Sequence, residues 1–272
     1  MLDIIVCLKI VMDPEVPLSV FKIDKNLKRP VPPAGLPPVV SPFDLNALEA
    51  ALKIKDQKQD ECVITILSLG KNIPKALLQK AMAMGADEAV VLDDAIFESL
   101  DPYSTAHALA NAIRKIGKFD LIFTGRQAAD WDSGIVWAGI AHHLQLPSIT
   151  IARKAVTFDN RLIVERCVYD GIEVLETDLP ALVTFSSEVG EPRFTSLKAM
   201  MRAKNKNITQ WTASDIGFEP VSGLVMRDIA EPVLVEVDCQ LIEGRSDEEK
   251  GRQLARALKA HRNFPIDSGG AL

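Results

Sequence analysis

The sequence is poor in aromatic residues and in basic charge, and its cysteines are not paired. Aromatic residues make up 6% of the chain, and the excess of acidic over basic residues gives a net charge of -6. Nucleic-acid binders use basic surfaces and aromatic stacking platforms, so this composition argues against a general nucleic-acid binder. The four cysteines include no CxxC pair, which is typical of reduced core residues in a cytosolic protein.

Motifs of common catalytic sites are absent as well. The sequence contains no GxxxxGK[ST] phosphate loop, no GxGxxG after a strand, no HExxH and no GxSxG elbow. His142 and His143 are adjacent, and adjacent side chains point in different directions on a helix, so they make a poor metal pair. We therefore expect a protein that binds or transfers something, without catalytic residues or a metal site.

The chain also lacks a long apolar run. The run from Ile4 to Val11 is too short for a signal peptide or a membrane span, and Asp3 stands where a signal peptide would be basic. The run instead predicts a buried first strand that is covered on both faces. We expect a cytoplasmic protein that does not insert into a membrane.

Strand-like runs alternate with helical patterns over residues 1 to about 148. The strands are expected at Ile4–Val11, Val63–Leu67, Ala89–Leu92 and Leu121–Thr124. The helices are expected from Pro42 onward and at Pro74–Met84, Tyr103–Ile113 and Ser133–Leu144. Such alternation predicts a Rossmann-like, doubly wound, mostly parallel α/β sheet. The last helix is apolar nearly all round, which indicates burial between layers. Ser41 is the expected N-cap of the first helix, with Asp44 three residues after it.

The pattern changes after residue 148. Residues 149–185 hold strand-like runs separated by the turn dipeptides Asp159-Asn160 and Asp170-Gly171, which predicts an antiparallel extension. Residues 208–272 show no clear periodicity before a charged helix at Asp247–His261. We expect residues 1–207 to form the α/β domain and residues 208–272 to be a C-terminal arm that lies on a partner. A loosely packed extension of the same domain is the alternative.

One loop is a candidate binding site. The stretch GRQAADWDSG begins at Gly125, directly after the fourth strand, and leads into the fourth helix. Ligands of open α/β sheets lie at the carboxyl ends of strands, and a helix N-terminus with small residues such as Ser133 and Gly134 suits a phosphate. The alternative is a simple capped loop in which Asp130 or Asp132 holds the helix end. Spacing alone does not choose between the two.

Residues 188–207, EVGEPRFTSLKAMMRAKNKN, follow a strand at Ala181–Phe185. Phe194 and Leu197 stand among small polar residues, and the segment then becomes basic. Apolar residues flanked by charge are typical of the anchor of a transient interface. The alternative is that the two apolar side chains tuck under the loop and that the basic run is a solvated helix face.

Four segments together resemble the small (β) subunit of electron-transfer flavoproteins. They are VCLKIVMDPEV, SPFDLNALEAALKIKD, GADEAVVLDD with FDLIFTGRQAADWDS, and GEPRFTSLKAMMRAK, and they span residues 1 to about 207. The resemblance implies a heterodimer with a larger (α) subunit that carries the redox-active FAD. It implies electron transfer from acyl-CoA-type dehydrogenases towards a membrane quinone oxidoreductase. The alternatives are an electron-bifurcating subunit with a second FAD and NADH as donor, and a stand-alone adenine-nucleotide-binding domain.

The resemblance also implies site residues. It assigns AMP, or a second FAD, to Cys7, Lys9, Ser41, Phe43, Asp44, Leu69, Arg126, Gln127, Asp132, Ser133, Gly134, Ile135 and Val136. Phe43 in addition matches an aromatic residue near the flavin ring of the larger subunit. Ile135 and Trp137 replace the Gln and Gly of the family pattern, so the resemblance favours AMP over a second flavin. Pro14 replaces a family Tyr near the flavin ring of the larger subunit, which implies different packing on that ring. It assigns dehydrogenase docking to Leu197 as the anchor, with Arg193, Phe194, Arg202 and Lys204 around it.

Overall fold

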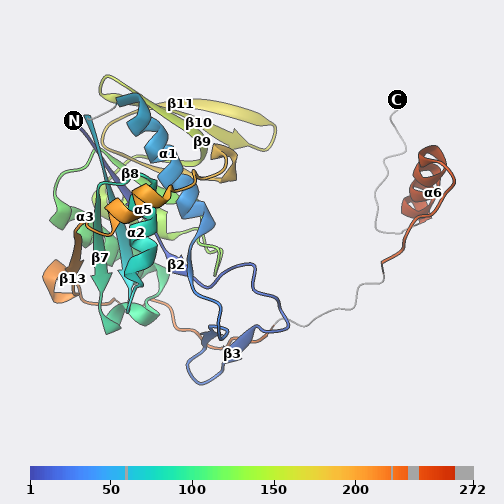
Figure 1. Ribbon diagram of the computed structural model, residues 1–272, viewed down its shortest axis with the longest axis horizontal. Helices are drawn as coiled ribbons and strands as arrows, with labels where there is room; N and C mark the ends of the chain where they lie inside the picture. The colour runs from blue at the N-terminus through green and yellow to red at the C-terminus, as the bar shows by residue number, and fades with distance from the viewer. Residues whose placement is uncertain (59–60, 222, 232–238, 261–272) are drawn as a thin grey trace. The chain divides into compact units, whose positions relative to one another are not determined.

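The computed structural model describes residues 1–58, 61–221, 223–231 and 239–260 (Figure 1). The chain divides into two compact units, Met1–Ala230 and Glu231–Leu272. The first unit holds the sheet and the helices that cover it. Within the described ranges, every helix is too short or too polar to reach across a bilayer.

The first unit is built on one large, mostly parallel sheet. In the described part of the chain it has nine strands, in the spatial order β11 (Gly171–Asp178), β10 (Arg161–Val168), β9 (Ser148–Phe158), β12 (Ala181–Phe185), β8 (Leu121–Gly125), β1 (Leu2–Cys7), β6 (Cys62–Gly70), β7 (Glu88–Asp93) and β13 (Ile208–Trp211). The chain moves from β1 outward to β6 and β7, and then returns to the other side of β1 at β8. The switch point of the sheet therefore lies between β1 and β8.

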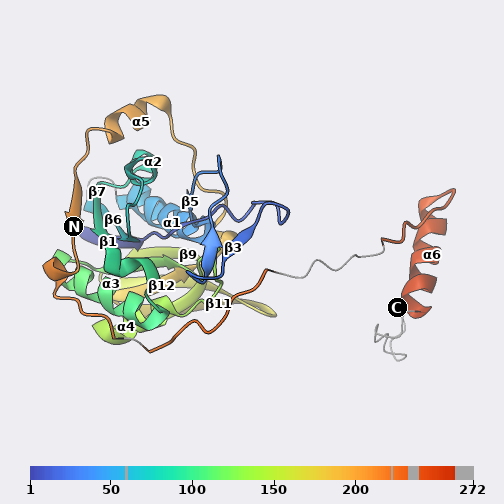
Figure 2. The same cartoon turned by 90° about the horizontal axis from the view of Figure 1, so that it is seen from below.

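Helices cover both faces of the sheet. On one face lie α1 (Pro42–Lys58), α2 (Lys75–Met84) and α5 (Leu197–Ala203), and on the other lie α3 (Pro102–Ile116) and α4 (Val136–Leu144) (Figure 2). A hydrophobic core lies on each face of the sheet, and alternate residues of β1 contribute to each. Ile4 and Val6 pack towards α1, while Ile5 and Cys7 pack towards α3. The predicted α/β fold is confirmed, and so is a first strand covered on both faces, but this strand ends at Cys7, and Ile10–Val11 form a separate strand outside the main sheet.

Local signals place most element boundaries as expected. The second helix follows Pro74 and ends before Gly85. The φ of Gly85 is 137°, which glycine adopts easily and other residues rarely do, so the chain can leave the helix there. The first helix begins at Pro42, which needs no N–H partner in the first turn. The two predicted turns at residues 159–160 and 170–171 join β9, β10 and β11 into an antiparallel extension. The next strand, β12, returns to parallel pairing between β9 and β8.

The fourth helix differs from its prediction in two ways. It begins at Val136 instead of Ser133, and among its residues Ile140 and Ala141 alone are fully buried. It packs closely on α3, because a Cβ at Gly139 would come within 2.5 Å of the Ala106 Cβ. The opposite side of α4 faces solvent, so the prediction of a helix buried between layers is wrong. The apolar composition of α4 indicates burial, but it cannot tell whether other elements cover the helix on one side or on both.

Two small ribbons and an edge strand complete the first unit. The ribbons are β2 (Ile10–Val11) with β5 (Val39–Val40), and β3 (Lys22–Asp24) with β4 (Arg29–Val31). The edge strand β13 pairs in parallel with β7. This strand lies in the segment that the sequence analysis assigned to the arm. The chain after it also stays with the first unit, since the Asp101 carboxylate accepts the N–H groups of Gly223 and Leu224.

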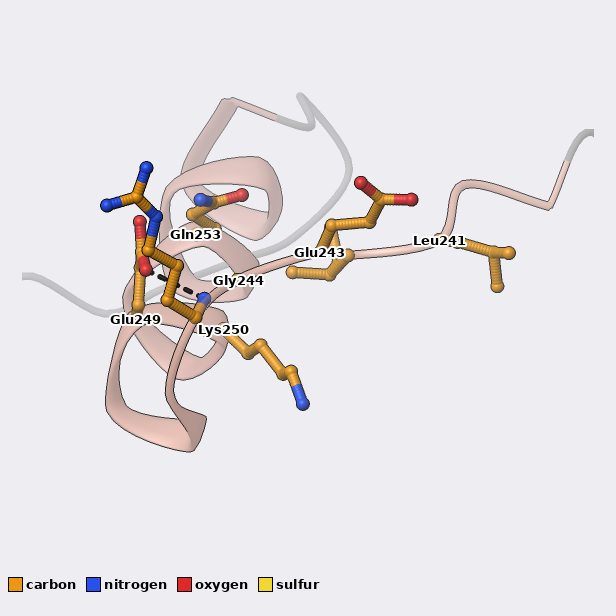
Figure 3. A pocket seen from close by; sticks show the side chains of 8 residues that line it. Leu241, Glu243, Gly244, Glu249, Lys250 and Gln253 are labelled. Atoms are coloured by element: carbon orange, nitrogen blue, oxygen red, sulfur yellow. Dashed lines mark hydrogen bonds between the residues drawn. The ribbon is translucent and has the colours of Figure 1, made fainter.

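The second unit contains α6 (Asp247–Ala260), none of whose residues is buried. The predicted end of this helix at His261 lies outside the described residues. An open hollow of about 880 Å³ separates the start of α6 from the extended chain before it (Figure 3). It is lined by Leu241, Ile242, Glu243, Gly244, Arg245, Glu249, Lys250 and Gln253. The charged side chains extend around this hollow without converging on one point, so it carries no sign of a ligand site.

Candidate functional site

The carboxyl ends of β1 and β8 meet at the first turn of α1, and Asp44 joins them. Its Oδ2 accepts the N–H of Lys9 at 2.7 Å, and its Oδ1 accepts the N–H of Gly125 at 3.0 Å. Burial raises the pKa of Asp44 to about 7, against the opposing effect of these two hydrogen bonds and of the Lys9 ammonium. A carboxyl group of this kind is poised to hold or lose a proton near neutral pH.

The backbone of β8 approaches α1 so closely that only glycine fits at its end. A Cβ on Gly125 would lie 2.6 Å from Asp44 Oδ1 and 2.8 Å from the Phe43 backbone. The next residue, Arg126, lies over the Phe43 ring with its guanidinium carbon 4.7 Å from the ring centroid. Its N–H donates to the Phe185 carbonyl at 2.8 Å. The Arg126 cation and the Phe43 ring therefore form one stacked wall beside the switch point.

The loop between Arg126 and α4 leaves three consecutive N–H groups free. Asp132, with φ of 50°, donates its own N–H to the Ala128 carbonyl and accepts from Gln127 Nε2 at 2.8 Å. Within the described ranges, the N–H groups of Ser133, Gly134 and Ile135 donate to no group of the chain. Free N–H groups in front of a helix attract an anion.

The capped-loop alternative does not hold. Asp130 instead pairs with Lys9, whose Nζ lies 2.6 Å from Asp130 Oδ2, and Asp132 bonds Gln127. Neither acid caps α4, whose N-terminus has no side-chain cap. Asp130 was not among the predicted binding residues, although it brings the loop over the end of β1. The sequence showed Asp130 only as an acidic residue in the loop after β8. Its pairing with Lys9 could not be predicted, because the two residues are far apart in the sequence.

Ser41 stands at the predicted N-cap position directly before α1, and its carbonyl accepts the N–H of Leu45 at 3.1 Å, but its side chain does not cap the helix. Its side-chain oxygen accepts the N–H of Ala129 at 3.4 Å, and Asp44 turns to the strand ends instead of the helix. Ser41 and Asp44 are buried against the ends of β1 and β8, and the Asp44 carboxylate satisfies the N–H groups there. Ser41 therefore ties the loop to the start of α1.

Most of the predicted nucleotide residues gather around this switch point. Cys7, Lys9, Ser41, Phe43, Asp44 and Arg126 surround the ends of β1 and β8, and residues 127 and 132–136 lie in the adjoining loop. Burial, and then the charge of Asp44, raise the pKa of the Cys7 thiol to about 12, so it stays neutral. Leu69 lies at the end of the next strand, β6, and packs against the core on the α3 side.

Two of the departures from the family pattern become clear in the structure. Trp137 is partly buried and packs against the core on the α3 side. Ile135 is 50% exposed, so its side chain does not pack into the core. Pro14 lies exposed in the loop before β3.

The predicted docking segment, residues 188–207, exposes Phe194 and Leu197, whereas Val189 and Ala203 near its two ends are buried. Phe194 is 100% exposed and Leu197 is 80% exposed, so the alternative in which they tuck under the loop does not hold. Leu197 begins α5, which Ser196 caps by accepting the N–H of Ala199 at 3.1 Å. Among the described residues, neither Arg202 nor Lys204 makes an ion pair.

Arg193 differs from what we expected of a steering charge. Its guanidinium forms ion pairs with Glu49 at 3.0 Å and with Asp56 at 2.8 Å, both on α1. The Glu49 side chain is only 5% exposed, and a buried carboxylate holds its cation far more strongly than a surface one does. Arg193 therefore binds within the chain, and its charge is not available to attract a partner.

Fold and site together define a Rossmann-like α/β protein whose loop after β8, at the switch point of the sheet, leaves the N–H groups of residues 133–135 without acceptors in the described part of the chain. Residues 34–216 match the family model of the electron transfer flavoprotein domain. The chain is 40% identical over 186 residues to the caffeyl-CoA reductase-Etf complex subunit CarD of Acetobacterium woodii, covering 68% of this chain and 71% of that protein. It is 38% identical over 218 residues to the electron transfer flavoprotein subunit beta of Clostridium acetobutylicum, covering 80% and 81%.

A third relative extends along nearly the whole chain. Protein FixA of Azotobacter vinelandii is 31% identical over 274 residues, covering 96% of this chain and 95% of that protein. The chain belongs to the electron transfer flavoprotein family, among its β subunits. It is thus an electron-transfer protein of a family that associates with flavin and nucleotide.

Proposed function

We propose that this chain is the small subunit of a heterodimeric electron-transfer flavoprotein. It accepts electrons from acyl-CoA-type dehydrogenases and passes them towards a membrane quinone oxidoreductase. The redox-active FAD is held mainly by the larger subunit, and the chain itself is an electron carrier without catalytic residues. The observation that carries the proposal is the exposure of Phe194 and Leu197 on a segment that is fastened to the fold on both sides. A self-contained nucleotide-binding domain has no use for such a segment.

We further propose AMP as the nucleotide of this chain. The free N–H groups of Ser133, Gly134 and Ile135 are the proposed donors to one phosphate group. Lys9, which pairs with Asp130 of the same loop, supplies a positive charge to this loop. Asp44 keeps the two strand ends and α1 together, so that the loop stays in place. Val136 and Gln127 flank the same loop, and their role is to shape it.

For docking we propose Leu197 as the anchor and Phe194 as its apolar neighbour. Arg202 and Lys204 attract an acidic partner surface, because they are exposed and unpaired within the described part of the chain. Arg193 is excluded from this steering role by its ion pairs with α1. The long-range attraction by lysine and arginine is weakened by salt, whereas the apolar anchor is not.

For the arm we propose that the second unit packs on the larger subunit. Leu254 on α6 is 47% exposed, and Leu241 before it is 80% exposed. Leu254 points out of a helix that buries none of its residues, so α6 has an apolar side that needs a partner. The segment before Glu231 stays with the first unit, and the proposed arm is correspondingly shorter than residues 208–272.

A second candidate has support from one relative. The name of the Acetobacterium protein describes it as part of a complex of caffeyl-CoA reductase with Etf, so the electrons of this chain could pass through a reductase complex. In that case the chain is a bifurcating subunit with a second FAD, and NADH is the donor. The cofactor content of the purified heterodimer decides between the candidates. One FAD with one AMP supports the first candidate, and two FAD support the second.

Further outcomes of the same measurement overturn parts of the proposal. Denatured heterodimer that releases no adenine nucleotide beyond FAD shows that the loop at residues 133–135 holds no nucleotide. A chain that purifies as a stable monomer with its own nucleotide supports the stand-alone binding domain. The control is the variant Arg161→Gln, which changes an ion pair on β10 far from the loop and should leave the cofactor content unchanged.

A further inference from the structure

One polar stripe along α1 reaches the chain directly before the exposed apolar residues. The stripe consists of Asn46, Glu49, Lys53 and Asp56, at spacings of three, four and three residues, which places them on one side of the helix. All four side chains bind groups within residues 189–193. A helix face that binds a single short segment with four side chains is more than a solvated surface.

Two of these contacts go to backbone carbonyls. Asn46 Nδ2 donates to the Gly190 carbonyl at 3.1 Å, and Lys53 Nζ donates to the Val189 carbonyl at 2.6 Å. The chain turns at Gly190, whose φ of 101° favours glycine. The two donors hold the carbonyls on either side of this turn, so the direction in which the chain leaves α1 is set here.

The other two contacts converge on Arg193. Its backbone N–H and its Nε both donate to Glu49 Oε2 at 3.0 Å, and its Nη2 donates to Glu49 Oε1 at 3.0 Å. Its Nη2 also donates to Asp56 Oδ2 at 2.8 Å. The planar guanidinium thus bridges two carboxylates in a forked geometry that lysine cannot reproduce.

The exposed residues begin immediately after this clamp. Phe194 is the next residue, and with Leu197 it projects into solvent, so packing of their own side chains does not hold them in place. On the far side, α5 lies along α2 (Figure 2), Ala203 is 1% exposed, and Lys206 Nζ donates to the Ala86 carbonyl at 2.6 Å. The docking segment is therefore fastened at both ends and free in the middle.

We propose that Glu49 and Arg193 are positioning residues that preorganise the docking segment for its dehydrogenase. They do not touch the partner. They hold the chain up to Phe194, so that Phe194 and Leu197 are presented in one arrangement before the encounter. A loop that is ordered in advance loses less conformational freedom on binding, which strengthens association. The inference rests on the proposed function, since it takes this segment as the surface that the dehydrogenase recognises.

The test uses the heterodimer with its FAD-carrying subunit, reduced by an acyl-CoA dehydrogenase and its acyl-CoA substrate. Arg193→Gln and Glu49→Gln should raise the KM for the heterodimer about tenfold and change kcat by less than about twofold. Reduction by dithionite should stay normal, because it needs no docking. Hydrogen exchange of the amides at residues 190–200 should become faster in both variants. The control Arg161→Gln, which also removes an arginine bound to two carboxylates, should change none of these.

The outcomes separate the two levels of the inference. If Leu197→Ala leaves the KM unchanged, the proposed docking function fails. If Leu197→Ala raises the KM while Arg193→Gln and Glu49→Gln do not, the positioning role alone is overturned. A lower melting temperature with an unchanged KM also overturns it, because the pair then only stabilises the fold. Should Arg193→Gln fail to fold, Glu49→Gln carries the test, since it keeps the shape and one acceptor.

Discussion

The buried carboxyl of Asp44 predicts a specific dependence of stability on pH. Burial raises its pKa from the ordinary value of 3.8 to about 7 in the folded chain. The folded state therefore binds this proton more tightly than the unfolded state does. The contribution of Asp44 to the free energy of unfolding is greatest below pH 4, falls as the pH rises towards 7, and is constant above that.

The size of this effect follows from the difference in pKa. One pKa unit corresponds to about 1.4 kcal/mol, so the rise from 3.8 to about 7 gives about 4 kcal/mol. The side chain is buried, so solvent does not screen this contribution away. Asp44→Asn removes the titration, and it exchanges one acceptor for a donor that faces the N–H of Lys9 or Gly125. Relative to ionised Asp44, that exchange lowers stability by about 1–3 kcal/mol, so the variant is less stable by this amount above pH 7 and by more at lower pH.

The measurement is urea unfolding of the wild-type chain and of Asp44→Asn between pH 4 and pH 8. Other titrating groups contribute equally to both proteins, so the difference between their unfolding free energies isolates Asp44. The wild type should lose about 4 kcal/mol relative to the variant over this range. A difference that stays constant to within about 1 kcal/mol would refute the reasoning, because Asp44 would then be ionised throughout. The control is Asp56→Asn, whose carboxylate is 60% exposed.

Three further predictions concern the docking segment and the nucleotide loop. Leu197→Ala should change stability by less than about 0.5 kcal/mol, yet cost more than about 1 kcal/mol of docking, measured by dehydrogenase-driven reduction beside a thermal melt. A drop of several degrees in Tm with intact docking contradicts it. Lys204→Glu should slow association at low salt and lose this effect at high salt, measured by stopped flow. Ser133→Pro should lower nucleotide retention about tenfold or more, measured on denatured heterodimer, because one charge-assisted hydrogen bond is lost.

Local chemistry explains which parts of the fold the sequence predicts. Pro74 and Gly85 bound α2 because each acts on its own backbone, and the turn at Asp170-Gly171 joins two strands for the same reason. The alternation of apolar runs and helical patterns predicts the parallel sheet, since buried strands and amphipathic helices show in neighbouring residues. The exposure of Leu197 was also visible in the sequence, as an apolar residue that follows Thr195 and Ser196 and precedes a basic run.

Contacts between distant residues were decided by the tertiary structure. Asp44 binds the N–H of Gly125, 81 residues further along the chain, and Arg193 binds Glu49 across 144 residues. Neither pairing has a local signal, because it depends on where α1 lies against the strand ends and the docking segment. The role of Arg193 therefore changed from a steering charge to a clamp.

The sequence by itself determined the central strands of the sheet, the helices between them and the chemistry of the candidate segments, because propensity and hydrophobic pattern act over a few residues. The two small ribbons and the edge strand β13 had no such local signal. Tertiary structure alone decided that α4 begins at Val136 and is covered on one side only, and that Trp137 packs into the core. It also decided which charged side chains form ion pairs within the chain, such as Lys9 with Asp130. Burial and ion pairing depend on surfaces that meet only after the chain has folded, so no short stretch of sequence encodes them.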